Sequence, residues 1–385
     1  MVLTGPADGP PALPPSGLVP AATAMGEELS RLTAGGRPVE LDALAVLAER
    51  AAVAGLTRQG RRSCGGACEL LPTADGWLAV SLPRSEDAAM VPAWLRAEGP
   101  LPALVAGRSG AELVASAADL GLAVAALGET DPAARAPVVA TAGAAAGPRA
   151  DLGEAVVVDL SSLWAGPLCG RVLGAAGARV IKVESVARPD GARSGPALFF
   201  DLLHAGHESV ALDLADPDGR RAFGALVERA DIVIEASRPR ALAQLGIDVA
   251  AEVARRPVVW VSITGHGREA GLRTAFGDDA AVAGGLVAGG SGDGPWFCAD
   301  AVADPLTGLT AAVAALDRWR TGGGWLLDVS MAAVAAACAG PPMAGPSDGP
   351  GAAPHARVAP GTARPLGADT DAVLAELVAP ARRRR

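Results

Sequence analysis

The chain lacks an excess of positive charge and long uncharged apolar runs. Its 385 residues hold 33 Lys and Arg against 42 Asp and Glu, a net charge of -9, which argues against a basic nucleic-acid footprint. No stretch of about 18 apolar residues without charge, Gly or Pro occurs, and the N-terminus has no basic region followed by an apolar core. We therefore expect a soluble, cytoplasmic protein that binds neither nucleic acid nor a membrane.

Cysteine and histidine are also scarce. Five cysteines in a chain of this length predict no disulfide framework, which favours a reducing compartment. Cys64 and Cys68 have no second ligand pair nearby, and His204 and His207 lack a third ligand at a suitable spacing. The sequence thus predicts no metal site, and we expect both histidines to lie in an exposed loop.

The common nucleotide-binding motifs are missing. The turn after Val158 runs from Ser161 to Pro167 and is not Gly-x-Gly-x-x-Gly, which disfavours an NAD site. Gly-x-x-x-x-Gly-Lys-Ser/Thr does not occur, which removes a P-loop. The helix that follows the turn can still bind an anion through its free N–H groups.

Half of the residues are hydrophobic, so the chain can bury a large core, and its length favours two or more domains. Residues 1–30, rich in Pro, Gly and Ala, are predicted to be a flexible lead-in. Residues 31–130 are predicted to form a small α+β unit, with a helix from Leu41 to Leu56 and a hairpin that turns at Asp75-Gly76. Residues 131–150 are predicted to be a linker.

Strands and helices alternate from residue 151 to 340. Runs rich in β-branched residues predict strands, and the segment after Asp216-Pro217 has the cap and first-turn proline of a helix. Strands buried on both faces and joined by helices specify a parallel α/β sheet, which binds ligands at the carboxyl ends of its strands. The predicted strands are 155–160, 179–184, 209–214, 231–235 and 258–263, and the predicted helices are 168–176 and 219–229.

The C-terminal part is predicted to contain a second linker and a closing helix. The linker covers residues 341–365, and the helix with its basic tail covers residues 366–385. The tail, Arg382 to Arg385, is the only basic run, and we assign it no function because such runs are usually solvated.

Three acidic residues each allow two interpretations. Asp278 and Asp279 either cap the helix that follows Gly277 or line an active site. Asp304 has the form of a helix cap with Pro305 at the first helical position. A lone carboxylate at the mouth of an apolar run is also suited to be a nucleophile, and local sequence does not decide between these roles.

Six sequence blocks occur in a fixed order between residues 154 and about 338. They are Val158–Pro167, Gly177–Glu184, Ser209–Leu214, Ala230–Pro239, Val259–Gly267 and Asp304–Gly308. In order and spacing they resemble the family III CoA-transferases, the formyl-CoA and carnitine CoA-transferase type. The resemblance implies an α/β fold with a Rossmann-like large domain, and it places Asp304 where the family carries its catalytic Asp before x-x-Thr-Gly.

The resemblance also implies an activity. CoA would move from an acyl-CoA donor to a small carboxylic acid by a ping-pong route, carried as an aspartyl-CoA thioester on Asp304. No covalently bound cofactor is implied, CoA or acyl-CoA is the substrate, and the expected partner is a second copy in an interlocked homodimer. The residues expected to bind the ligand are Trp164, Ala165, Gly166, Lys182, Arg193, Asp278, Asp279, Gly284 and Gly285.

Two departures from the family pattern keep alternatives open. His204 to Glu208 stands where relatives carry Asn-x-x-Lys-Arg, so an acid replaces an expected cation, and Arg193 or Arg171 is the candidate substitute. Residues 341–365 are too few for the family's small domain, part of which the unit at 31–130 resembles, so a shortened or rearranged member is predicted. A catalytically degenerate member that binds CoA or a dimer partner remains an alternative. So does an enzyme of the α-methylacyl-CoA racemase type, although Gly277–Asp279 lacks the His it would use.

Overall fold

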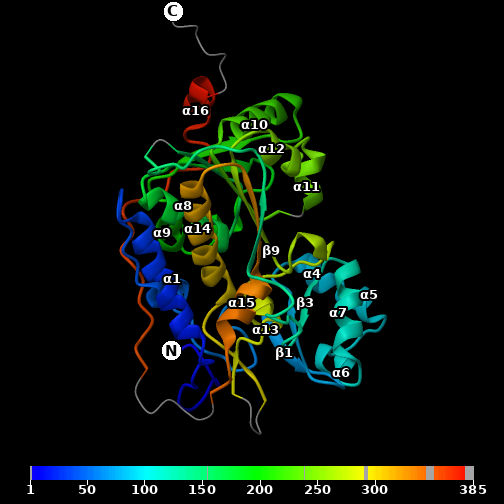
Figure 1. The fold of residues 1–385 in the computed structure, drawn as a ribbon. Coiled ribbons are helices and arrows are strands. Elements are labelled where there is room, and N and C mark those ends of the chain that lie inside the picture. Colours follow the sequence, from blue (N-terminus) through cyan, green and yellow to red (C-terminus); the bar gives the residue numbers. More distant parts are fainter. Residues whose placement is uncertain (1, 154, 238, 290–293, 344–350, 378–385) are drawn as a thin grey trace, which may run out of the picture.

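A seven-stranded sheet forms the centre of the molecule (Figure 1). The computed structural model describes residues 2–153, 155–237, 239–289, 294–343 and 351–377. Neighbouring strands of the sheet are parallel except at one edge, where β4 is antiparallel to β12. In spatial order the strands are β4 (Val138–Ala142), β12 (Trp325–Ser330), β9 (Val259–Thr264), β8 (Ile232–Glu235), β5 (Val156–Asp159), β6 (Arg179–Ser185) and β7 (Glu208–Leu212). The predicted parallel α/β sheet is confirmed.

Helices cover both faces of this sheet. Val157 and Val158, neighbours on β5, belong to apolar clusters on opposite faces, because successive side chains of a strand point in opposite directions. The larger cluster includes α1 (Leu18–Thr33), α8 (Ala165–Ala175), α9 (Ala197–His204), α14 (Ala303–Thr321) and α15 (Met331–Ala339). The second includes α10 (Pro217–Arg229), α12 (Val249–Arg255) and α16 (Thr370–Leu377), and α11 (Pro239–Gln244) precedes α12. The cap predicted at Asp216 is confirmed by its bonds to the N–H groups of Asp218 and Gly219.

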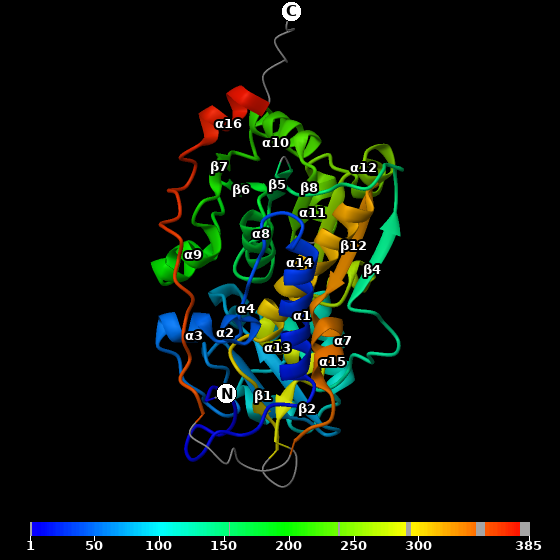
Figure 2. The same cartoon turned by 60° about the vertical axis from the view of Figure 1, so that its left-hand side comes forward.

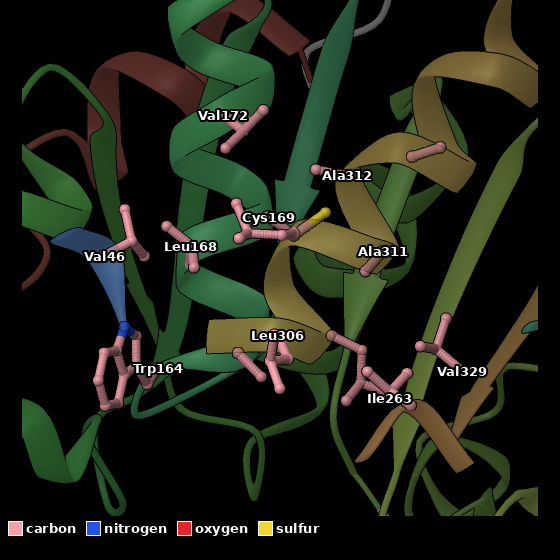
Figure 3. Packing of buried hydrophobic residues seen from close by; sticks show 14 of the residues in the cluster. Val46, Trp164, Leu168, Cys169, Val172, Ile263, Leu306, Ala311, Ala312 and Val329 are labelled. Carbon is pink, nitrogen blue, oxygen red and sulfur yellow. The ribbon is translucent and has the colours of Figure 1, made fainter. Parts of the chain in front are cut away.

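Helices α8 and α14 pack tightly side by side (Figure 3). Leu168 and Cys169 of α8 and Leu306 of α14 are fully buried between them. A Cβ on Gly308 would lie 2.6 Å from the carbonyl oxygen of Ala165, so glycine is what permits this approach. The first turn of α14 is therefore held beside the first turn of α8.

The N-terminal part contains a separate three-stranded antiparallel sheet beside the large one (Figure 1). Its strands are β1 (Cys68–Pro72), β2 (Trp77–Ser81) and β3 (Ala123–Ala126), and its helices are α4 (Ser85–Ala89), α5 (Val91–Leu95), α6 (Leu101–Val105) and α7 (Gly110–Asp119). The hairpin predicted between β1 and β2 is confirmed. That this unit corresponds to a fragment of the family's small domain stays a prediction.

The small unit docks on the large domain through α13 (Gly277–Ala283). The N–H groups of Gly128 and Thr130 donate to the carbonyls of Val282 and Ala283 at 3.0 and 2.9 Å. The hairpin of β10 (Val287–Ala288) and β11 (Trp296–Phe297) lies next to it, and its Val287 and Phe297 share an apolar cluster with Cys68. The remaining described elements are four short helices: α2 (Ala43–Val46), α3 (Glu49–Ala54), η1 (Gly191–Ser194) and η2 (Arg268–Ala270).

Two predicted loops are ordered elements, and both predictions were wrong for a physical reason. The lead-in at 1–30 contains most of α1, whose Leu18 and Leu29 are fully buried in the core beside α14, so a few well-spaced leucines outweigh the Pro and Gly content. The linker at 131–150 contains β4, which is mostly exposed but is held by backbone pairing with β12. Backbone pairing needs no long side chains, so the composition gave no sign of it.

The C-terminal segment runs back along α9 and α3 before it reaches α16 (Figure 2). Arg357 donates two hydrogen bonds to Glu49, at 2.7 and 2.8 Å, and Glu49 is fully buried. The N–H of Ala363 donates to Asp201 of α9 at 2.7 Å. The predicted closing helix is present as α16, whereas residues 344–350 of the second linker and the tail Arg382 to Arg385 lie outside the described residues.

None of the helices in the described part of the chain has the length and apolar character that a bilayer crossing needs.

Candidate active site

A cavity of about 340 Å³ opens at the carboxyl ends of β5, β8 and β9. The loop after β5, with Leu160 and Ser161, forms one wall; Ser237 follows β8, and Thr264 is the last residue of β9. Asp304 lies in the lining beside them. Parallel sheets present their ligand sites at this edge, because loops and helix N-termini converge there.

Asp304 is not the helix cap that its sequence suggested. Helix α14 begins with Val302 as its cap residue, so Asp304 is the second residue of the helix, and no side chain caps it. Among the described residues, none donates a hydrogen bond to the Asp304 carboxylate. Gly277 lies against Oδ2 of Asp304, where an added Cβ would clash with that oxygen. Asp304 is thus largely buried, reaches the cavity surface and lies close to the start of α13.

Three further carboxyl groups and one guanidinium surround Asp304. Asp279 and Asp300 are fully buried, and Asp278 accepts a hydrogen bond from the N–H of Ala301 at 3.0 Å. Arg50, on α3, binds Asp300 with two hydrogen bonds, of which the one from Nε to Oδ2 is 2.9 Å long. Arg50 is therefore an ion-pair partner of this cluster and lowers the pKa of Asp304 by its charge.

This arrangement changes the acidity of the cluster. Burial raises the pKa of Asp304 to about 7; Arg50 opposes the rise, and Asp278, Asp279 and Asp300 add to it. Burial also raises the pKa of Asp278 to about 6 and that of Asp279 to about 7. Groups with strongly shifted pKa values in a cavity mark candidate reactive sites. Asp304 combines the shift with an open position in the cavity.

The pH dependence of any reaction at Asp304 follows from this shift. A carboxylic acid with a raised pKa loses its proton only near pH 7, and only the carboxylate is nucleophilic. We expect the rate to fall about tenfold per pH unit below pH 7 and to level off above it. Initial rates measured from pH 5 to 9 test this, and a rate that stays constant down to pH 5 would contradict it.

Ala165 and Gly166, two of the predicted ligand-binding residues, line the cavity. They form the first turn of α8, so the positive end of the helix dipole faces the ligand space. Trp164 is buried behind them, with its ring 5.3 Å from Phe199 and the guanidinium of Arg50 5.6 Å from its centre. Trp164 thus supports the loop and is absent from the cavity lining.

The structure does not bring Lys182 and Arg193 into the cavity. Lys182 is buried, with its Nζ 3.0 Å from Asp190 and donating to the carbonyl of Ser161. Arg193 donates to both oxygens of Glu184 and stacks on Phe200 at 4.4 Å. Both side chains therefore form ion pairs within the protein. The sequence pattern did not reveal these acidic partners.

The remaining predicted residues have structural contacts. Asp279 accepts hydrogen bonds from the N–H of Phe276 and from the hydroxyl of Ser81, so it stabilises the start of α13. A Cβ on Gly284 would lie 2.4 Å from the N atom of Ala336, which shows that this glycine allows close packing on α15. Gly285 has a φ of 77°, which favours glycine. Neither glycine lines the cavity.

His204 and His207 are buried, contrary to the prediction of an exposed loop. Burial lowers the pKa of His207 to about 3 and that of His204 well below its ordinary value. Both are therefore neutral at pH 7. Across the described residues, no group of three or more His, Cys, Asp and Glu side chains is arranged to hold a metal ion.

Sequence reasoning missed four charged residues at the site. Arg50 and Asp300 are 250 positions apart, and Arg84 and Arg273 line the cavity from the two different parts of the fold. The sequence signal that could have pointed to Arg50 is the pair Glu49-Arg50 within an apolar helical stretch. Charged residues in such a stretch are rarely buried unless they have ion-pair partners, so partners elsewhere in the chain were to be expected.

Fold and site together define an α/β protein with a candidate nucleophilic aspartate at the carboxyl edge of a parallel sheet. The model of CoA-transferase family III matches residues 152–365, more than half of the chain. The chain belongs to CoA-transferase family III.

Known relatives share part of this chain. An acyl-CoA transferase of Fusarium pseudograminearum is 32% identical over 200 residues, which are 46% of this chain and 44% of the relative. A succinyl-CoA–D-citramalate CoA-transferase of Chloroflexus aurantiacus is 29% identical over 200 residues, 48% of this chain and 50% of the relative. A CAIB/BAIF family protein from Brucella suis, whose crystal structure is known, gives a TM-score of 0.45 at 29% identity over 48% of this chain and 54% of that one. The chain spans about half the length of the curated relatives it matches.

Proposed function

We propose that this chain is an acyl-CoA:carboxylate CoA-transferase that carries CoA as an aspartyl-CoA thioester on Asp304. The observation that carries the proposal is the position of Asp304, an unpaired carboxylate with a raised pKa in a cavity at the carboxyl edge of the sheet. Family membership supports the proposal, and the Chloroflexus relative is named for moving CoA between two carboxylic acids.

The proposed chemistry starts with attack of the Asp304 carboxylate on the thioester carbonyl of the donor. The C–S bond breaks, CoA leaves as a thiolate, and a mixed anhydride of Asp304 and the donor acid remains. The thiolate then attacks the Asp304 carbonyl, which releases the donor acid and leaves the aspartyl-CoA thioester. An acceptor carboxylate repeats the two steps in reverse, so no other cofactor is consumed.

The site supports these steps in three ways. The first turn of α8, with Ala165 and Gly166 in the lining, directs its partial positive charge toward the space where the oxyanion forms. Burial raises the pKa of Asp304, which makes its carboxylate more basic than an ordinary one and hence a better nucleophile above pH 7. Fixed positions of donor and nucleophile provide the effective concentration that a weak nucleophile needs.

The racemase alternative requires a histidine and an acidic residue that together remove a proton from the α-carbon of the substrate and return one to it. The described lining of the cavity contains Asp304 and no histidine, which favours the transferase. The proposal also includes a cytoplasmic location and an interlocked homodimer, the latter testable by light scattering.

The experiment is a transfer assay with a panel of acyl-CoA donors and carboxylic acids, followed by mass spectrometry of the acyl-CoA products. We expect new acyl-CoA species and parallel double-reciprocal plots, the pattern of a ping-pong reaction. Binding of CoA without any transfer across the panel would contradict the proposal and favour the catalytically degenerate alternative.

A further inference from the structure

Among the residues that the structure describes, the charged ones in the cavity lining are Arg84, Arg273 and Asp304. Asp304 is the proposed nucleophile, so two cations remain without a role in the transfer steps. Arg84 follows β2 in the small unit, whereas Arg273 precedes α13 in the large domain. The cavity therefore has an anionic reactive group and two cationic groups that come from the junction of the two units.

Each arginine is anchored by an acid and keeps free donors. Arg84 donates from Nε and Nη2 to Asp87, both at 2.9 Å, and its Nη1 has no partner among the described residues. Arg273 donates from Nη2 to Glu129 and to the carbonyl of Val124, which leaves Nε and Nη1 without partners in the described part of the chain. A guanidinium held in this way is ready to bind a carboxylate with little loss of side-chain freedom.

The two arginines line the same cavity as Asp304. The guanidinium of Arg84 is 5.8 Å from the ring centre of Phe276, and Phe276 directly precedes Gly277, which abuts the Asp304 carboxylate. Arg273 is three residues before Phe276 on the same loop. All three charged residues therefore belong to one cavity of about 340 Å³.

We propose that Arg84 and Arg273 bind the second, unreactive carboxylate of a short dicarboxylic acid whose other carboxyl group reacts at Asp304. This inference rests on the proposed transferase function. Each guanidinium keeps N–H donors that its acidic partner leaves unused, one carboxylate can accept from both groups, and a cavity of about 340 Å³ holds a short diacid.

Phosphate groups of CoA could use the same donors, but the geometry favours the diacid. The pantetheine arm separates the CoA pyrophosphate from the sulfur, so phosphates at Arg84 and Arg273 would place the thioester outside this cavity, away from Asp304. A diacid keeps both of its carboxyl groups within it. The small unit then selects the acid, because Arg84 belongs to that unit and lies outside the segment that matches the family.

The test compares glutarate and butyrate as acceptors with one acetyl-CoA donor, in the parent protein and in Arg84→Met, Arg273→Met and the double variant. We expect the parent to prefer glutarate by at least about tenfold in kcat/KM, since a paired charge adds specificity. Each single variant should lower kcat/KM for glutarate about 10- to 100-fold and leave that for butyrate within about twofold. Arg221→Met, an exposed arginine on α10, is the matched control and should change neither.

Calorimetric binding of glutarate and butyrate gives a readout that needs no turnover. Glutarate should bind the parent more tightly than butyrate and lose this advantage in the double variant, with Arg84→Lys and Arg273→Lys keeping part of it. Equal affinity of the parent for both acids would overturn the inference. The inference would also be overturned if the arginine variants lowered kcat/KM equally for both acids and this loss disappeared with an N-acetylcysteamine thioester donor. Such a donor lacks the CoA phosphates, so that result would assign the arginines to phosphate binding. Absence of transfer with intact glutarate binding would refute the proposed function alone.

Discussion

Asp304→Asn is expected to lower CoA transfer at pH 8 by about three orders of magnitude or more. The amide matches the carboxylate in shape but cannot form the mixed anhydride, so both half-reactions stop. Donor acyl-CoA should still bind, because the cavity keeps its walls at Leu160, Ser161 and Thr264. The measurement is the single-turnover release of CoA from a donor, compared with its binding to the same variant.

The same substitution should make the protein more stable at pH 8, which separates lost chemistry from lost folding. Burial raises the folded-state pKa of Asp304 above its ordinary value of 3.8, to about 7. Its contribution to stability is therefore present below about pH 3.8 and is lost as the pH rises through 7. At pH 8 the buried charge costs free energy, and Asn removes it, for a gain of about 1–3 kcal/mol in urea unfolding. A less stable variant at pH 8 would contradict the assigned environment.

Arg50→Met has the second-largest expected effect, because it removes the guanidinium whose charge lowers the pKa of Asp304. Arg50 lowers the pKa of Asp304 against the effect of burial, so its loss should shift the midpoint of the pH–rate profile upward by about one unit or more. For a rise of one to two units the rate at pH 7 should fall about 5- to 50-fold, and most of it should recover by pH 9 to 10. The free energy of unfolding should fall by about 3–5 kcal/mol, since Asp300 is fully buried and loses its partner.

Two further variants separate the electrostatic effect of Arg50 from its structural effect. Arg50→Lys keeps the charge but loses the paired hydrogen bonds to Asp300, so the midpoint should stay near that of the parent. The double variant Arg50→Met with Asp300→Asn should recover stability, because no unpaired charge remains buried. An unchanged pH midpoint in Arg50→Met would show that this guanidinium does not act on Asp304.

Much of the fold was predictable because its determinants are local. Apolar runs such as Val156–Asp159, spaced by helical segments, specify parallel strands with crossovers, and Asp75-Gly76 specifies a tight turn. Helix α1 and strand β4 were missed, because their stability comes from contacts with α14 and β12 that lie far away in sequence. Tertiary packing there outweighs a composition that looks like a loop.

Of the predicted site residues, the structure brings Asp304, Ala165 and Gly166 into the lining of one cavity, and their roles stay predictions. The two cations predicted to bind the ligand, Lys182 and Arg193, instead form ion pairs with Asp190 and Glu184. The spacing of residues in the sequence does not show which charged side chains will form such pairs in the fold. The cations that lie near Asp304 or line its cavity among the described residues come from other segments. Arg50 and Arg84 precede the segment that matches the family, so neither periodicity nor the resemblance pointed to them.

The most direct measurement of the central claim is trapping of the covalent intermediate. The protein would be mixed with a donor acyl-CoA that it turns over, treated with hydroxylamine and digested, and the peptide that contains Asp304 would be examined by mass spectrometry. The account predicts a hydroxamate at Asp304, formed only when donor is present and absent from Asp304→Asn. A hydroxamate at another residue, or full turnover with Asp304 never modified, would contradict it.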